Sequence, residues 1–156
     1  MKLSIYWLRQ NSTVLHYARF AAPLGEGHMP VDEMRVVCIE DEPEMIDLVR
    51  LILGRKGFEV IGADGGVEGL QTVKREKPDL VLLDLMMPDM DGWEVYQQIK
   101  ADEELRGIPI VVVTAKAQSI DKVLGLHIAK VDDYITKPFG PQELLESVEK
   151  ILGITE

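Results

Sequence analysis

Five polar side chains that could do chemistry follow short apolar runs of this sequence. They are Glu40, Asp41, Asp84, Thr114 and Lys137. Carboxylates that lie close together raise one another's pKa unless a cation neutralises them, and a set of oxygen ligands suits a hard ion such as Mg²⁺. A carboxylate beside Mg²⁺ can attack phosphorus and form an acyl phosphate, while an ammonium and a hydroxyl bind the phosphoryl oxygens. If the fold brings the five together, the pattern predicts a site that accepts a phosphoryl group.

Taken one by one, the same residues have simpler explanations. Asp84 alone is typical of a helix cap after a strand, Thr114 of an ordinary strand residue, and Lys137 of a solvated charge. The interpretation as a site therefore depends on the elements that position these side chains.

Those elements are strands that alternate with helices along the chain. The predicted strands cover residues 36–39, 58–61, 80–83, 108–113 and 131–136. The predicted helices cover about residues 43–53, 66–76, 93–100, 120–129 and 144–152. Strands that are apolar throughout are typical of a parallel sheet covered by helices on both faces. We therefore expect an α/β protein with a (βα)5 flavodoxin-like three-layer fold, its parallel sheet in the order 2-1-3-4-5.

This topology predicts where the polar side chains lie. In such sheets the site is beyond the carboxyl ends of the strands, where the strand order reverses between strands 1 and 3. Glu40 and Asp41 follow strand 1 and Asp84 follows strand 3, while Thr114 and Lys137 follow strands 4 and 5. We therefore expect all five at one edge of the sheet.

The composition argues against several other classes of protein. The chain has 156 residues, with 17 Lys and Arg against 27 Asp and Glu, for a formal net charge of -10. Such a balance repels phosphate backbones, so we expect no direct DNA binding. The single cysteine, Cys38, excludes a disulfide framework and suits a reducing compartment, so we expect a cytoplasmic location. No apolar run approaches the ~18 residues that a membrane span needs, so we expect no membrane insertion.

Four segments resemble the receiver domain of two-component response regulators. They are residues 36–43 (VVCIEDEP), 80–92 (LVLLDLMMPDMDG), 110–115 (IVVVTA) and 132–139 (DDYITKPF). The resemblance extends over about residues 34–153, which we interpret as the receiver domain. Residues 1–33 are interpreted as an N-terminal extension, either disordered or non-native, or a short helix that docks on the domain or on a partner. Residues 154–156 form a tail.

The resemblance implies a role for each residue of the predicted site. Asp84 would be the phosphoacceptor, with a sensor histidine kinase or a phosphotransfer protein as the donor. Glu40, Asp41, Asp84 and the backbone carbonyl of Met86 would hold Mg²⁺, and Lys137 would pair with the phosphoryl group. Glu40 stands where the family more often has Asp, and its longer side chain is expected to reach the metal through water. The protein would catalyse only its own phosphoryl transfer and autodephosphorylation, and would not be an enzyme for other substrates.

The resemblance also implies a conformational switch made of Thr114 and Tyr134. The hydroxyl would move toward the phosphoryl group and the aromatic ring would turn inward, which alters the surface around helix 4, strand 5 and helix 5. Since four residues follow Leu152, we expect a stand-alone, single-domain regulator. Its output would pass through a downstream protein partner or a homodimer.

Two other functions are alternatives to a phosphoryl-accepting switch. An aspartyl phosphatase usually carries a second Asp two residues after the first, but that position is Met86, which transfers no proton. A flavodoxin-like flavin carrier needs a phosphate loop after strand 1, where the acidic residues 40–42 would repel a phosphate. Asp89 and Asp91 resemble a fragment of a calcium loop without its remaining ligands, so turn and helix-cap roles are favoured for them.

Overall fold

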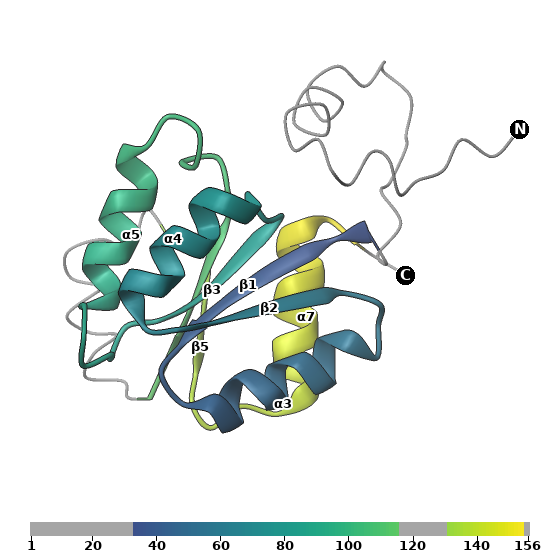
Figure 1. Cartoon of the computed structure of the whole chain (residues 1–156). Coiled ribbons are helices and arrows are strands. Elements are labelled where there is room, and N and C mark those ends of the chain that lie inside the picture. The colour runs from purple at the N-terminus through teal and green to yellow at the C-terminus, as the bar shows by residue number, and fades with distance from the viewer. Residues whose placement is uncertain (1–32, 116–130, 155–156) are drawn as a thin grey trace, which may run out of the picture.

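The structure is a computed structural model that describes residues 33–115 and 131–154 (Figure 1). The strands are Arg35–Glu40 (β1), Glu59–Asp64 (β2), Leu80–Asp84 (β3), Ile110–Thr114 (β4) and Asp133–Thr136 (β5). The helices are Pro43–Gly54 (α3), Gly66–Glu76 (α4), Gly92–Ala101 (α5) and Pro141–Leu152 (α7). The predicted helix at 120–129 and residues 1–32 of the predicted extension lie outside the described residues.

The five strands form one parallel sheet in the order β2-β1-β3-β4-β5, which confirms the predicted topology. In its register, Val37 of β1 pairs with Ile61 of β2 and with Val81 of β3. Helices α3 and α7 lie on one face of the sheet, and α4 and α5 lie on the other (Figure 1). The described residues thus have the three layers of a flavodoxin-like fold.

Each face of the sheet buries its own core. Successive strand residues point to opposite faces, so Cys38 and Leu82 pack toward α3 and α7, while Ile39 and Leu83 pack toward α4 and α5. A strand covered on both sides has no solvent-facing row of side chains, which explains why these strands are apolar throughout. Beyond the last apolar residue of each central strand, the chain reaches the edge of the sheet, and polar residues begin.

Local sequence sets most helix boundaries. Pro43 and Pro141 begin α3 and α7, since a first-turn position has no intrahelical use for the N–H that proline lacks. The Asp91 carboxylate accepts a hydrogen bond of 2.9 Å from the backbone N–H of Trp93 and caps α5. Gly153, with φ of 69°, ends α7 in the left-handed conformation that glycine adopts readily.

Each strand differs from its predicted bounds by at least one residue, and the largest shifts are in β2 and at the starts of β4 (Ile110 instead of residue 108) and β5. β2 continues to Asp64, which pairs with Glu40, because the small residues Gly62 and Ala63 extend the ladder beyond the apolar run. β5 begins at Asp133, later than the predicted residue 131. Within the part of the chain that the structure describes, no helix combines the length and apolar character needed to span a bilayer.

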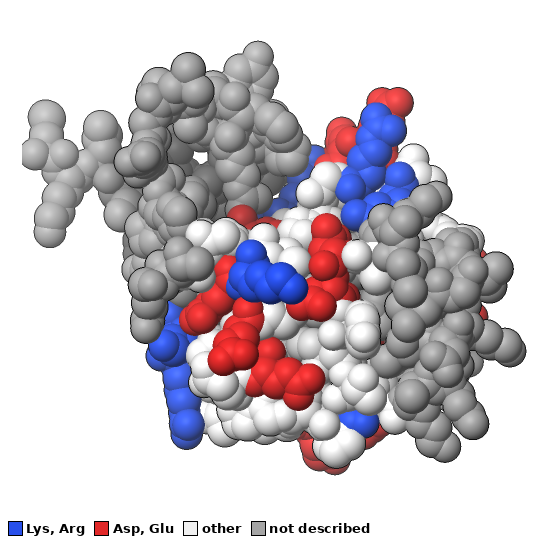
Figure 2. All heavy atoms as spheres, turned by 180° about the vertical axis from the view of Figure 1, so that it is seen from behind, with Lys and Arg blue, Asp and Glu red and all other residues white. Residues whose placement is uncertain are grey.

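Acidic side chains gather in the middle of the face opposite to the view of Figure 1 (Figure 2). Helix α7 itself is rich in acids (Glu143, Glu146 and Glu149), with Lys150 as the basic residue of its last turn. This surface agrees with the formal net charge of -10.

Candidate functional site

The carboxyl edge of the sheet brings three predicted acidic residues together. Glu40 ends β1, Asp84 ends the neighbouring β3, and Asp41 follows Glu40 directly. One carboxylate oxygen from each of the three lies within 4.8 Å of the others. Glu40 and Asp84 are 2% and 4% exposed, so two of these charges lie in the interior. Such a group of acids is unfavourable unless cations lie beside it.

Lys137 supplies one cation to this group. Its Nζ lies 2.5 Å from Oε2 of Glu40 and 3.6 Å from Oδ2 of Asp84, and its side chain is 10% exposed. The backbone N–H of Lys137 donates to the carbonyl of Thr114 at 2.8 Å, which continues the β4–β5 pairing one step beyond β5. The strand pairing therefore directs the lysine toward the acids.

Both oxygens of the Glu40 carboxylate already accept hydrogen bonds. Oε1 accepts from the backbone N–H groups of Asp41 and Glu42 at 3.2 and 3.3 Å, and Oε2 accepts from Lys137. This arrangement makes Glu40 the main partner of the lysine. Asp41 and Asp84 present the remaining carboxylate oxygens of the group. Glu42, the second acid after β1, is exposed and stands at the N-cap position of α3 without a side-chain capping hydrogen bond.

The pKa of both members of the Glu40–Lys137 pair is raised, for different reasons. Burial raises the pKa of Glu40 to about 7, the hydrogen bond from Lys137 opposes this rise, and the charge of Asp84 adds to it. Burial lowers the pKa of Lys137, but the hydrogen bond to Glu40 and the charges of Asp84, Glu40 and Glu42 outweigh it and raise that pKa. The site therefore favours the binding of positive charge.

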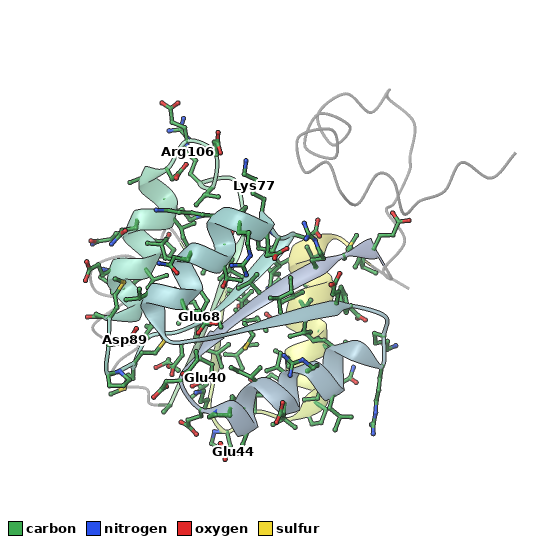
Figure 3. The ribbon with its side chains drawn as sticks, in the orientation of Figure 1. Glu40, Glu44, Glu68, Lys77, Asp89 and Arg106 are labelled. Carbon is green, nitrogen blue, oxygen red and sulfur yellow. The ribbon has the colours of Figure 1, made fainter. Side chains whose placement is uncertain are left out.

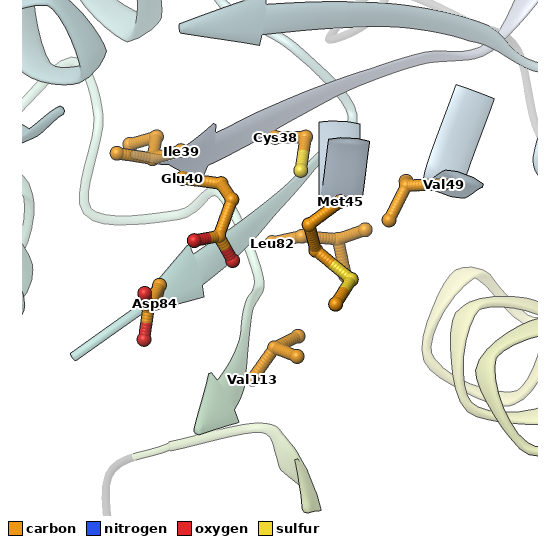
Figure 4. A pocket seen from close by; sticks show the side chains of 8 residues that line it. All are labelled: Cys38, Ile39, Glu40, Met45, Val49, Leu82, Asp84 and Val113. Carbon is orange, nitrogen blue, oxygen red and sulfur yellow. The ribbon is translucent and has the colours of Figure 1, made fainter. Parts of the chain in front are cut away.

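The floor beneath the acids is apolar (Figure 4). A small pocket below Glu40 and Asp84 is lined by Cys38, Ile39, Met45, Val49, Leu82 and Val113. These neighbours exclude water from the lower side of the two carboxylates, which is the physical cause of the burial effect on Glu40. Burial also raises the pKa of the Cys38 thiol to about 12, so this cysteine behaves as a core residue.

Thr114 and Tyr134 both belong to this edge of the sheet, but their surroundings are opposite. Thr114 is fully buried, and among the described residues its Oγ1 has no hydrogen-bond partner. Tyr134 pairs in register with Val112, two residues before Thr114, so both side chains leave the sheet on the same face. The Tyr134 side chain is exposed. A buried hydroxyl without a partner is rare in folded proteins and asks for a functional reason.

Met86 lies in the loop that follows β3. Its backbone N–H donates to Oδ1 of Asp84 at 3.1 Å, which turns the loop back over the acid, and its side chain is exposed. The next residue, Met87, is buried in the core on the α4 and α5 side. The loop is therefore fixed on one side of Asp84 and exposed on the other.

The donor set fits a small, hard divalent cation. All three acids offer oxygen, the ligand type that Mg²⁺ prefers. Oxygens on opposite sides of Mg²⁺ lie about 4 Å apart, since each ligand distance is about 2.1 Å. The spacing of 4.8 Å or less in this group is close to that value, and small side-chain rotations would close the difference.

Asp89, predicted to serve a turn or a helix cap, does cap a helix, but not one that its local sequence indicates. Its carboxylate accepts hydrogen bonds from the backbone N–H groups of Gly66 and Val67, at 3.1 and 3.2 Å. The helix it caps is thus α4, which precedes it in the chain by more than twenty residues, and no short-range spacing could indicate that contact.

Comparison with known proteins identifies the family. The family model of the response regulator receiver domain matches residues 36–149 of the sequence, and the chain belongs to this family. Among solved structures, a receiver domain protein from Methanospirillum hungatei has 32% sequence identity and a TM-score of 0.69, over 77% of this chain and 94% of its own. A response regulator from Thermotoga maritima, solved with Mg²⁺ and BeF, has 30% identity and a TM-score of 0.68, over 76% of this chain and 98% of its own.

Two curated relatives are a transcriptional regulatory protein and a DNA-binding response regulator by name. The alkaline phosphatase synthesis transcriptional regulatory protein PhoP of Bacillus subtilis is 41% identical over 122 residues, which are 78% of this chain and 50% of that protein. The DNA-binding response regulator MtrA of Mycolicibacterium smegmatis is 39% identical over 128 residues, 82% of this chain and 54% of that protein. The chain thus spans about half the length of the curated relatives that it matches.

These relatives correct one prediction. The expectation of no direct DNA binding, drawn from the net charge, is wrong, because curated relatives are named as DNA-binding regulators. The accompanying expectation of output through a separate partner or a homodimer, drawn from the four residues after Leu152, is overturned with it. The net charge describes the surface of the part that matches them, and a receiver domain needs no affinity for phosphate backbones of its own to belong to a DNA-binding protein.

Proposed function

We propose that this chain is a phosphorylation-dependent signalling switch in which Asp84 accepts a phosphoryl group from a sensor histidine kinase or a phosphotransfer protein. Membership of the receiver family supports the class of function. The observation that supports the particular residue is the position of Asp84, buried at the sheet edge between two further acids and 3.6 Å from the Lys137 ammonium.

The proposed chemistry is an in-line transfer. An oxygen of Asp84 attacks phosphorus, a P–O bond forms, the P–N bond to the donor histidine breaks, and the histidine keeps the electron pair. Lys137 is placed to bind an equatorial oxygen of the phosphoryl group, where negative charge is greatest. Asp41, Asp84 and the Met86 carbonyl would hold Mg²⁺ directly, with Glu40 beside them. The metal ion would supply further charge neutralisation.

Thr114 and Tyr134 are the proposed switch. The buried Thr114 hydroxyl has no partner among the described residues, and a phosphoryl oxygen on Asp84 would offer an acceptor. Tyr134 starts from an exposed position on the same face and can turn inward when Thr114 moves. The new ring position would alter the surface at β5 and α7, and the names of the relatives support control of DNA binding as the output.

The remaining expectations form part of the same proposal. The receiver domain is placed at residues 34–153, and the buried Cys38 thiol agrees with a cytoplasmic location. Catalysis is limited to phosphoryl transfer to Asp84 and its hydrolysis. The aspartyl phosphatase alternative finds no support, since the exposed residue two positions after Asp84 is Met86.

The test is labelling with acetyl phosphate and Mg²⁺, followed by intact-mass spectrometry. We expect the wild-type chain to gain one phosphoryl group and Asp84→Asn to gain none, because an amide oxygen is a poor nucleophile. The matched control is Asp79→Asn, which should label normally: Asp79 is a half-buried carboxylate just before the opposite end of β3 and accepts a hydrogen bond from the backbone N–H of Arg35. An unlabelled wild type would refute the proposal, and a labelled Asp84→Asn would move the acceptor elsewhere.

A further inference from the structure

The loop between β3 and α5 is held at both of its own ends. The backbone N–H of Gly92 donates to the carbonyl of Leu85 at 3.2 Å, and Asp91 caps α5. A side chain at Gly92 would collide with the backbone of Asp84, so the two ends of the loop lie in close contact. These contacts fix where the loop begins and ends, but its middle, with Met86, Pro88 and Asp89 exposed, extends beyond them.

The middle of the β3–α5 loop is hydrogen-bonded to a different helix, α4. Asp89 accepts two hydrogen bonds from the first turn of α4, from Gly66 and Val67 at 3.1 and 3.2 Å. Figure 3 shows Asp89 beside the start of α4, with Lys77 at the far end of that helix. A carboxylate is favoured there, because the first N–H groups of a helix lack intrahelical acceptors and carry partial positive charge.

Two glycines make this approach feasible. A Cβ on Gly65 would lie 2.8 Å from Oδ2 of Asp89, and a Cβ on Gly66 would lie 2.7 Å from Cβ of Met90. Gly65 also has φ of 93°, a conformation that other residues rarely adopt. The start of α4 is thus shaped to receive the loop. The hydrogen bonds from Gly66 and Val67 lower the pKa of Asp89, so its carboxylate is charged at neutral pH.

We propose that Asp89 is a positioning residue that holds the β3–α5 loop on α4 and thereby places the backbone carbonyl of Met86 for Mg²⁺. This inference rests on the proposed function. Met86 lies between the Asp84 contact at its own N–H and the Asp89 contact three residues later. With both contacts in place the carbonyl is oriented before the metal binds. Without Asp89, metal binding must also order the middle of the loop, and that loss of conformational freedom weakens affinity.

The test measures Mg²⁺ affinity by isothermal titration calorimetry, without a phosphodonor. We expect Asp89→Ala to raise the dissociation constant for Mg²⁺ about tenfold, an ordinary cost for ordering part of a binding site. The dissociation constant of Asp89→Asn, which retains one acceptor oxygen, should lie between those of the wild type and Asp89→Ala. The control is Asp102→Ala: Asp102 also accepts from a loop N–H, that of Glu104 at 2.9 Å, and lies beyond the far end of α5. It removes the same charge and should leave the affinity unchanged.

Labelling separates positioning from a general loss of structure. At saturating Mg²⁺, Asp89→Ala should accept phosphate from acetyl phosphate at nearly the wild-type rate, while its half-saturating Mg²⁺ concentration rises with the dissociation constant. Wild-type affinity in both Asp89 variants would overturn the inference, as would equal weakening in Asp102→Ala. If the wild type itself bound no Mg²⁺ and took no label, the proposed function would fail first.

Discussion

The two edges of the sheet carry charges in opposite states of balance. At the amino edge, Arg35 bonds Glu76 through its guanidinium at 2.8 Å, and its backbone N–H donates to Asp79 at 2.8 Å. At the carboxyl edge, three acids gather, Lys137 contacts two of them, and among the described residues the Thr114 hydroxyl has no partner. At the amino edge these polar groups have partners within the chain, whereas at the carboxyl edge several are left for an added ligand.

The difference separates stability from function. The Arg35 contacts join the start of β1 to Glu76 at the end of α4 and Asp79 just before β3, 41 and 44 residues later in the sequence. They are partly exposed and balanced, so removing one costs a modest amount of stability. At the carboxyl edge Glu40 and Asp84 are buried, negative charge is in surplus, and the Thr114 hydroxyl is an unsatisfied donor among the described residues. Such a site is stabilised most by binding a cation and a phosphoryl group, and it is stabilised little by contacts within the chain itself.

The largest expected effect is at Lys137. Lys137→Met should lower the rate of labelling by acetyl phosphate about 100-fold, because one positioned charge on the phosphoryl oxygens is removed. The matched variant at the other edge, Arg35→Met, should label at the wild-type rate and lose ~1 kcal/mol of unfolding free energy in urea. Equal labelling in the two variants would mean that the two edges do not differ in function.

The second prediction concerns the metal and Asp41. At a Mg²⁺ concentration ten times the dissociation constant, a ligand that binds only the folded state adds about 1.4 kcal/mol to the unfolding free energy. We expect this gain for the wild type, measured by thermal or urea unfolding with and without Mg²⁺ against EDTA. Asp41→Ala should lose most of it, since a charged oxygen ligand is missing. Glu76→Ala, at the amino edge, should keep the full gain, and an undiminished gain in Asp41→Ala would place the cation elsewhere.

The smallest expected effect is a gain in stability. Thr114→Val keeps the shape of the side chain and removes the buried hydroxyl that has no partner among the described residues. We expect the unfolding free energy to rise by ~1 kcal/mol, because burying an unsatisfied hydroxyl is unfavourable. Labelling should continue, but the phosphorylation-linked change in Tyr134 exposure, followed by its absorbance, should be lost. Reduced stability would indicate that the hydroxyl has a favourable partner in the unphosphorylated state.

Much of the fold was predictable because its signals are local and periodic. The bounds of α4 agree with the prediction at both ends, and α5 differs from its predicted range by one residue at each end. The order of the strands followed from the rule for parallel sheets with right-handed connections. The same rule brought Glu40, Asp84 and Lys137 to one edge without any knowledge of distances.

The details of the site were not predictable in the same way. The sequence suggested that Glu40 would face the metal, and the structure gives both of its oxygens to donors within the chain, one of them Lys137, which is 97 residues away. Asp89 was predicted to serve a turn or a helix cap; it does cap a helix, but one that begins 22 to 23 residues earlier. Neither contact follows from residue type and spacing, since each depends on how far two separate segments approach.

The sequence by itself determined which chemical groups stand at the strand ends and which strands neighbour one another, because apolar periodicity and turn residues act over a few positions. The tertiary structure alone decided which partners those groups have: which acid pairs with the lysine, which buried hydroxyl has no partner within the described part of the chain, and which helix binds the loop beside Asp84. These outcomes depend on differences of an ångström between segments that meet only after folding. Hydrogen bonds and ion pairs change strongly over such differences.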